Sequence, residues 1–207
     1  KICGLSALTA ALIEAGSASV HTDLFFRQTD TRTLALDWVE RHIPADTSVL
    51  IQPYSVPLRP SRAALVEALT THLGSPDAAS IRFQRQLSLD PYPAPAYRTI
   101  FLGVGGLDVD KIYVAQSDFA TGSLDVLRRM AVTHVVLKRY NAPDSSMDGL
   151  VTSLATNGHL LASFSPYGPA TSGVIRPLPA PFLHNTDTRI AAGLERPGPV
   201  VEIWSIN

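Results

Sequence analysis

The sequence has few of the residues that would cross-link or strongly charge a chain. Cys3 is the only cysteine among 207 residues, which excludes an intramolecular disulfide and a metal site built from thiolates. Charged residues make up 17% of the chain, against about 25% in a typical globular protein. The formal net charge is −1 and no run of Lys or Arg occurs. Because nucleic-acid binding needs clustered positive charge, we expect no nucleic-acid partner.

The chain also lacks a long apolar run. The longest one near the start, residues 2–13, contains two hydroxyl residues and ends at Glu14, whereas a membrane span needs about 20 apolar residues. The sequence predicts a short helix over residues 5–15, ended by Gly16 and followed by a connector. We therefore divide the chain into an N-terminal helix and connector, residues 1–22, and a single α/β domain, residues 23–207.

Capping residues and short apolar runs place the elements of this domain. Asp30 is a good N-cap for a helix that Pro44 ends, and Ser61 caps a second helix that Gly74 closes. Further helices are predicted over residues 124–131 and 147–155, and strands over 49–51, 97–102, 111–115, 135–137, 159–164 and 200–206, with a weaker strand pattern at 81–89. This alternation predicts an α/β fold: a three-layer Rossmann-like sandwich with a parallel or mixed sheet.

No motif for metal, cofactor or hydrolytic chemistry is complete. The Gly103–Gly106 segment follows a strand, but it leads into another strand, whereas phosphate binding needs a helix N-terminus. A glycine turn is therefore favoured. Asp108 and Asp110 have no EF-hand spacing around them, and the histidines have no metal-ligand spacing. We predict no metal, no cofactor and no catalytic residue, and we place the acids on the solvent faces of helices (Asp37, Glu40, Glu67 and Asp125).

Two loops carry candidate ligand-binding residues. The long loop at residues 165–199 contains His184, Asn185, Asp187 and Arg189, which could bind a sugar or a phosphate or could satisfy the loop's own backbone groups. The loop at residues 53–60 contains Tyr54 and Arg59 and follows the first buried strand. Ligands of open α/β sheets gather beyond the carboxyl ends of strands, so this position is geometrically favoured.

Several segments together resemble a known class of membrane enzyme. Residues 30–44 (DTRTLALDWVERHIP), followed by the VLI run and the PYSVPL loop, are similar to the start of the soluble C-terminal domain of multi-spanning glycosyltransferases. These are the dolichyl-phosphate-mannose–protein mannosyltransferase-like and aminoarabinose-transferase-like proteins. Residues 127–137 and the tail at 182–204 also resemble that family.

The resemblance implies an extracytoplasmic (periplasmic) accessory domain that is not catalytic alone. In the family, sugar transfer from a polyprenyl-phosphate donor depends on an acidic residue in a loop of the membrane module, and no position here matches that loop. The implied partners are the membrane-embedded catalytic module of the same polypeptide and a glycan or lipid-linked acceptor. Residues 2–15 would be the end of the last membrane helix. Two alternatives stay open: a free-standing Rossmann-type enzyme that binds a nucleotide or nucleotide-sugar near Tyr54 or Gly105, and a non-enzymatic binding or assembly module that uses the 165–199 loop.

Overall fold

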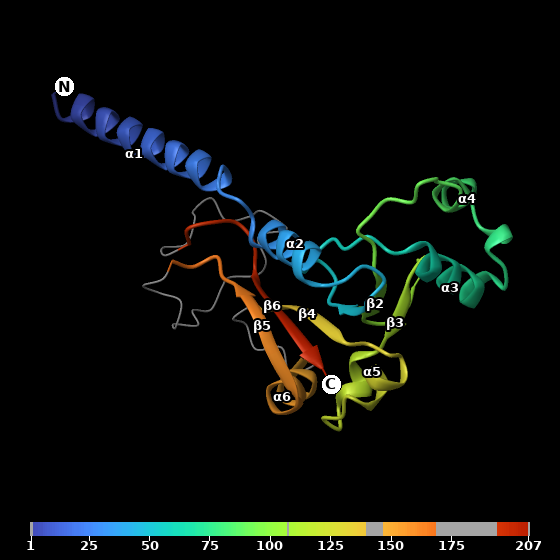
Figure 1. Cartoon of the computed structure of the whole chain (residues 1–207). Coiled ribbons are helices and arrows are strands. Elements are labelled where there is room, and N and C mark those ends of the chain that lie inside the picture. Colours follow the sequence, from blue (N-terminus) through green and yellow to red (C-terminus); the bar gives the residue numbers. More distant parts are fainter. Residues whose placement is uncertain (1, 107, 140–146, 169–193, 207) are drawn as a thin grey trace.

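The computed structural model describes residues 2–106, 108–139, 147–168 and 194–206, with side chains described from Glu14 onward. The helices are α1 (Ile2–Phe26), α2 (Thr31–His42), α3 (Arg62–Leu73), α4 (Ile81–Leu87), α5 (Asp125–Arg129) and α6 (Asp148–Asn157), with 3-10 turns η1 (Pro76–Ala78) and η2 (Gln116–Phe119). The strands are β1 (Ser48–Ile51), β2 (Arg98–Leu102), β3 (Ile112–Val114), β4 (His134–Arg139), β5 (Gly158–Phe164) and β6 (Val200–Ile206). Figure 1 shows the sheet at the centre, α1 projecting from the body, and α3 and α4 forming a lobe on the other side.

The six strands form one mixed sheet in the order β3-β2-β1-β4-β6-β5. Strands β1 to β4 pair in parallel, and β6 runs antiparallel to both β4 and β5. The predicted α/β fold class with a mixed sheet is therefore confirmed.

Alternate side chains along the strands belong to two separate hydrophobic cores, one on each face of the sheet. Leu50, Ile100 and Leu137 pack on one face against α5 and α6. Val49 and Val136 point to the other face and pack against α2 and the buried side chains of the 52–60 loop. Because side chains alternate across a strand, a strand covered on both faces is apolar at every position. This arrangement is compatible with the predicted three-layer sandwich.

The predicted caps are confirmed. The Asp30 carboxylate accepts a hydrogen bond from the backbone N–H of Arg32 at 2.7 Å, and α2 begins at the next residue. Ser61 Oγ accepts the N–H of Ala64 at 3.2 Å at the start of α3, and Gly74 ends that helix with φ 78°. These short polar signals fix helix ends because the first N–H groups of a helix have no partner within it.

Two predicted elements are wrong. Gly16 does not end the first helix, which runs on to Phe26, because Gly16 does not adopt the left-handed conformation by which Gly74 terminates α3. The weak strand pattern at residues 81–89 is the helix α4 instead. Phe83 of α4 packs with Leu65 and Leu69 of α3 in a small core of its own, so tertiary contact overrides the weak alternation.

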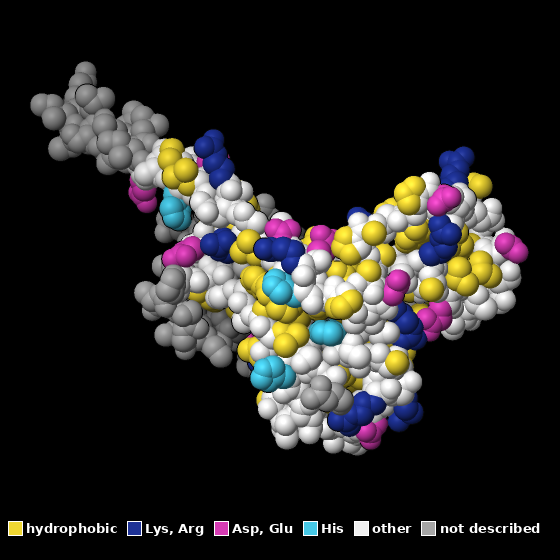
Figure 2. All heavy atoms as spheres, viewed as in Figure 1, with side chains coloured by type: hydrophobic (Ala, Val, Ile, Leu, Met, Phe, Trp, Pro, Cys, Tyr) yellow, Lys and Arg dark blue, Asp and Glu magenta, His cyan; other side chains and the backbone are white. Residues whose placement is uncertain are grey.

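The basic side chains do not gather in one place on the visible face. In Figure 2 the Lys and Arg side chains lie in small groups over the body and over the lobe formed by α3 and α4, with acidic and uncharged side chains between them.

Candidate functional site

The carboxyl ends of β1 and β4 form the topological switch point of the sheet. After β1 the chain passes to β2 and then β3 on one side, and it returns to β4 on the other side of β1. In open α/β sheets this point is the usual place for a ligand, because the two connections leave in opposite directions and open a crevice between them. The residues at the carboxyl ends of these strands, a region called the switch-point edge below, are Gln52, Pro53 and Tyr54 after β1 and Lys138 near the end of β4.

A tight turn follows β1 at this edge. The N–H of Ser55 donates to the carbonyl of Gln52 at 3.1 Å, and Ser55 Oγ donates to the same oxygen at 2.6 Å. Gln52 is anchored to β4, since its N–H donates to the Val136 carbonyl at 3.0 Å and its Oε1 accepts the N–H of Lys138 at 2.9 Å. The base of the turn is therefore fixed to two neighbouring strands.

Tyr54 stands at the third position of this turn with φ 65°. Pro53 precedes it, and a proline followed by a residue of positive φ is the pattern of a type II turn, where glycine or asparagine is preferred. The Tyr54 side chain is 71% exposed, and the Lys138 ammonium lies 5.1 Å from its ring centroid. The edge thus presents an aromatic ring beside a cation.

The helix α1 joins the body at this same edge of the sheet. The N–H of Thr31 donates to the Pro197 carbonyl at 3.0 Å, and Thr31 Oγ1 donates to the Pro199 carbonyl at 2.7 Å. The next residue, Val200, pairs with Arg139 at the carboxyl end of β4. The start of α2, and with it the exit of α1, is therefore held close to the end of the strand that carries Lys138.

Of the two predicted site residues that the structure describes, Tyr54 lies at the switch point and Arg59 does not. Arg59 lies at the opposite edge, because its carbonyl accepts the N–H of Tyr97 just before β2 and its Nη1 donates to the Pro95 carbonyl at 3.2 Å. The chain turns back after Tyr54 and buries two loop side chains, Val56 and Leu58, against the sheet. The predicted residues His184, Asn185, Asp187 and Arg189 lie outside the described residues. Lys138 was not predicted, because its place depends on β4 lying next to β1.

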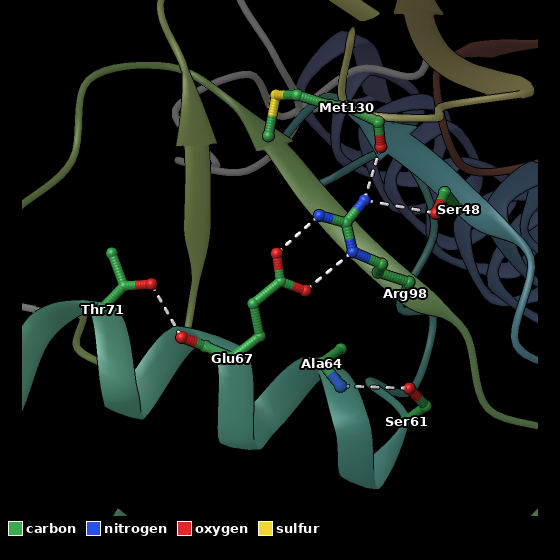
Figure 3. Close-up of polar contacts among 7 residues, drawn as sticks. All are labelled: Ser48, Ser61, Ala64, Glu67, Thr71, Arg98 and Met130. Carbon is green, nitrogen blue, oxygen red and sulfur yellow. Dashed lines mark hydrogen bonds and ion pairs between the residues drawn. The ribbon is translucent and has the colours of Figure 1, made fainter. Parts of the chain in front are cut away.

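A different polar cluster, drawn in Figure 3, lies at the amino ends of the parallel strands, called the amino edge below. Arg98 donates from Nε and Nη2 to the two carboxylate oxygens of Glu67, at 2.7 and 2.5 Å. Its Nη1 donates to the Met130 carbonyl at 2.6 Å and to Ser48 Oγ at 3.3 Å. Glu67 was predicted to be a solvent-facing acid, and its side chain is 40% exposed, but this lone Glu of α3 also forms an ion pair with Arg98, the first residue of β2. The hydrogen bonds from Arg98 lower the pKa of Glu67, and those to Glu67 raise the pKa of Arg98.

We expect Glu67→Gln to lower the free energy of unfolding by about 1 kcal/mol at pH 7, a value reduced for the exposed part of this ion pair. Because the folded pKa of Glu67 lies below its ordinary 4.5, the stabilisation is complete above that value and is lost as the pH falls through the folded pKa. Urea unfolding at pH 7 and pH 3 measures this. Asp125→Asn, which alters the exposed pair with Arg128, is the control and should change nothing measurable. An equal loss in Glu67→Gln at both pH values would contradict this account.

The remaining candidates have structural partners. The segment from Gly103 to Gly106 joins β2 to β3, and no helix begins behind it within the part of the chain that is described. Asp108 accepts hydrogen bonds from Lys111 at 2.8 Å and from Tyr113 at 3.0 Å, which lower its pKa. Among the described residues, no group of three or more His, Cys, Asp or Glu side chains could hold a metal ion.

The described histidines are also scattered. His42 stacks on Trp38 at 4.5 Å between ring centroids, and His72 lies on α3 with its Nε2 2.9 Å from the Lys111 carbonyl oxygen. Burial lowers the pKa of His134, which is half-buried at the start of β4. Each of these rings therefore lies at a different place in the fold.

Fold and site define an α/β protein with a mixed six-stranded sheet and an aromatic–cation pair at its switch point. Comparison with protein-family models, curated proteins and solved structures found no match to this chain. In the described part of the chain, none of the helices has both the length and the apolar character that crossing a membrane requires.

Proposed function

We propose that this chain is an extracytoplasmic accessory domain of a polyprenyl-phosphate-sugar-dependent membrane glycosyltransferase. In this proposal a membrane-embedded module of the same polypeptide carries the bond-making groups and connects to the domain through α1. The observation that carries the proposal is the way α1 leaves the body, together with the resemblance of residues 30–44 and 182–204 to that family.

Most of the described side chains of helix α1, from Glu14 onward, are exposed. The helix spans 25 residues, about 37 Å at 1.5 Å per residue, and it projects away from the sheet (Figure 1). Of its described side chains only Phe25 is buried, whereas Val20, Leu24 and Phe26 are 59, 52 and 56% exposed. Helices in water owe most of their stability to packing of an apolar face. A long helix that exposes apolar side chains is therefore expected to have a further partner, and the upstream membrane module would supply it.

The junction between α1 and the body also suits this role. The hydrogen bonds of Thr31 to the 197–199 segment fix the start of α2, so that α1 is joined to a well-anchored part of the domain. Because this junction is next to the carboxyl end of β4, a module attached through α1 would lie near the switch-point edge. The accessory domain would then present Tyr54 and Lys138 to the path of a glycan or lipid-linked acceptor.

Cysteine labelling in intact cells tests the location. The full-length protein with Cys3→Ser and Asp77→Cys would place one new thiol in η1, where Asp77 is exposed. We expect a membrane-impermeant maleimide to label this protein in intact cells, and the same protein without Asp77→Cys serves as the control. Labelling of position 77 only after lysis would place the domain on the cytoplasmic side and would contradict the proposal.

Sugar transfer tests the division of labour. We expect membrane vesicles that contain the full-length protein to transfer sugar from a polyprenyl-phosphate donor, and the purified 207-residue chain to transfer none under the same conditions. Turnover by the isolated chain would contradict the proposal, because it would put the reacting groups within these residues.

A free-standing nucleotide-binding enzyme is less well supported by the path of the chain after β1. In nucleotide-binding α/β folds a helix N-terminus meets the phosphates directly behind the first strand. Here α3 starts at the amino edge, where the N–H of Ser61 donates to the Tyr97 carbonyl at 2.7 Å. Thermal unfolding with nucleotides distinguishes the two, since a ligand that binds only the folded state raises the melting temperature.

A further inference from the structure

Tyr54 occupies a backbone conformation that tyrosine rarely adopts. Its φ of 65° lies in the left-handed region, where a Cβ atom crowds the neighbouring carbonyl and a bulky residue is a genuine outlier. The turn is nevertheless held on both sides, by the hydrogen bonds of Ser55 to the Gln52 carbonyl and of Gln52 to β4. The rest of the fold therefore imposes this conformation on the residue at position 54.

Packing of the Tyr54 side chain offsets little of the free-energy cost of this backbone conformation. With 71% of its surface exposed, it buries far less apolar area than an aromatic core residue such as Tyr97, which is fully buried. A glycine would satisfy the same turn without strain. A strained, exposed aromatic residue at the place where α/β sheets bind ligands indicates a binding role, because such outliers concentrate at functional sites.

The surroundings of the ring define the chemistry of a ligand. The Lys138 side chain faces the same side of the sheet as Val136, and its ammonium lies 5.1 Å from the Tyr54 centroid. An ammonium group has three N–H donors, so it can donate to more than one acceptor, a ligand oxygen among them, while it stays beside the ring. The backbone of Lys138 is fixed by the Gln52 side chain at 2.9 Å. The pair therefore offers an aromatic face and a cation at a set separation.

We propose that Tyr54 and Lys138 bind a phosphorylated saccharide, with the apolar face of a pyranose ring on Tyr54 and the phosphate oxygens toward Lys138. The choice of a saccharide rests on the proposed function, whereas the site rests on the turn and the sheet edge. The same chemistry occurs in a free hexose 1-phosphate and in a prenyl-phosphate-linked hexose, and the experiment separates these two sources.

Saturation-transfer NMR on the 207-residue chain gives a direct test. The probes are mannose 1-phosphate, glucose 1-phosphate, a short-chain prenyl-phosphate-linked hexose, a neutral methyl hexoside, inorganic phosphate and uridine monophosphate. We expect the sugar phosphates to bind and the neutral hexoside to bind at least tenfold more weakly, because it lacks the charge-assisted hydrogen bond to Lys138. Tighter binding of the prenyl-linked probe would identify the lipid-linked sugar as the source, and equal binding of both sugar phosphates would identify the head group alone.

Tyr54→Gly separates binding from folding. It removes the ring and also the strain at positive φ, so we expect sugar-phosphate binding to fall about tenfold or more. The melting temperature should stay the same or rise by up to about 4 °C. Tyr54→Phe keeps the ring and should retain binding, whereas Lys138→Met should bring sugar-phosphate binding down to the level of the neutral hexoside. Arg59→Met, at the opposite edge of the sheet, is the matched control and should bind as the wild type does.

Several results would overturn the proposal. These are equal binding by the wild type and Tyr54→Gly, binding of inorganic phosphate as tight as that of the sugar phosphates, tighter binding of uridine monophosphate, or no binding of any probe. A clear fall in the melting temperature of Tyr54→Gly would show that the ring serves the fold instead. Labelling at position 77 does not involve Tyr54, so failure of the membrane assignment and failure of this site can be told apart.

Discussion

Gly149→Ala is expected to lower the free energy of unfolding by about 3 kcal/mol, although alanine is the better helix former by about 1 kcal/mol. Gly149 lies in the first turn of α6, against the backbone of η2. A Cβ atom built on Gly149 would lie 2.2 Å from the Phe119 carbonyl oxygen and 3.1 Å from its carbonyl carbon. Backbone atoms cannot rotate away as a side chain can, so α6 would have to move off the core that it shares with β4. Urea unfolding followed by circular dichroism measures the loss.

Gly16→Ala is the matched control for this prediction. Gly16 also lies within a helix, α1, but apart from its chain neighbours and the backbone of α1 itself, no atom of the described residues lies within 4 Å of a Cβ atom added there. We expect the unfolding of the domain to be unchanged and the helix content to be the same or slightly higher. If Gly149→Ala unfolds at the same urea concentration as the wild type, the close approach of α6 to η2 is not real.

The second large effect is expected from Gly198→Ala, which we predict to destabilise the domain by about 3 kcal/mol. Gly198 has φ 106°, and an added Cβ atom would lie 2.1 Å from Thr31 Oγ1 and 3.0 Å from the Thr31 backbone nitrogen. Thr31 is fully buried and bonds to the carbonyls of the residues on either side of Gly198. The substitution would therefore push the start of α2 away from the segment that leads into β6. Hydrogen exchange should become faster at the first amides of α2, including that of Thr31.

Gly122→Ala separates backbone strain from this close contact. Gly122 also has a positive φ of 71°, but among the described residues beyond its chain neighbours, its added Cβ atom would meet only Ser153 Oγ, at an ordinary 3.6 Å. We expect a loss of about 1 kcal/mol, from strain alone, and no change in the hydrogen exchange of α2. If Gly198→Ala and Gly122→Ala lose the same stability and show the same hydrogen exchange at Thr31, the close contact between Gly198 and Thr31 does not hold α2 to β6.

The elements that sequence reasoning found share one property, which is that a local signal specifies them. The Asp30 and Ser61 caps act on backbone groups two or three residues away, and Gly74 ends α3 through its own φ. The apolar runs of β1 and β4 require burial on both faces wherever they lie in the sheet. Gly16 was mispredicted because a glycine gives this kind of helix end only when it takes up the left-handed conformation. The 81–89 segment was mispredicted because Phe83 packs on α3, beyond the few residues over which a strand pattern is read.

The candidate site was predicted only in part, for a similar reason. Tyr54 was found because the position after a buried strand is favourable in any open sheet, which needs only the local order of residues. Arg59, six residues past Pro53, was placed at the same edge, whereas the chain turns back across the sheet face and carries it to the other. Lys138 meets Tyr54 because β4 lies beside β1 in parallel register, a pairing of segments more than eighty residues apart.

By itself, the sequence determined the class of fold, the helix caps and the buried strands, since these depend on residue type and on neighbours a few positions away. Only the tertiary structure decided that the ring at position 54 stands beside Lys138, that Glu67 is paired with Arg98, and that α1 leaves from the switch-point edge. Each of these depends on which strands lie side by side, and that order is set by packing of the whole sheet, which no short stretch of residues contains.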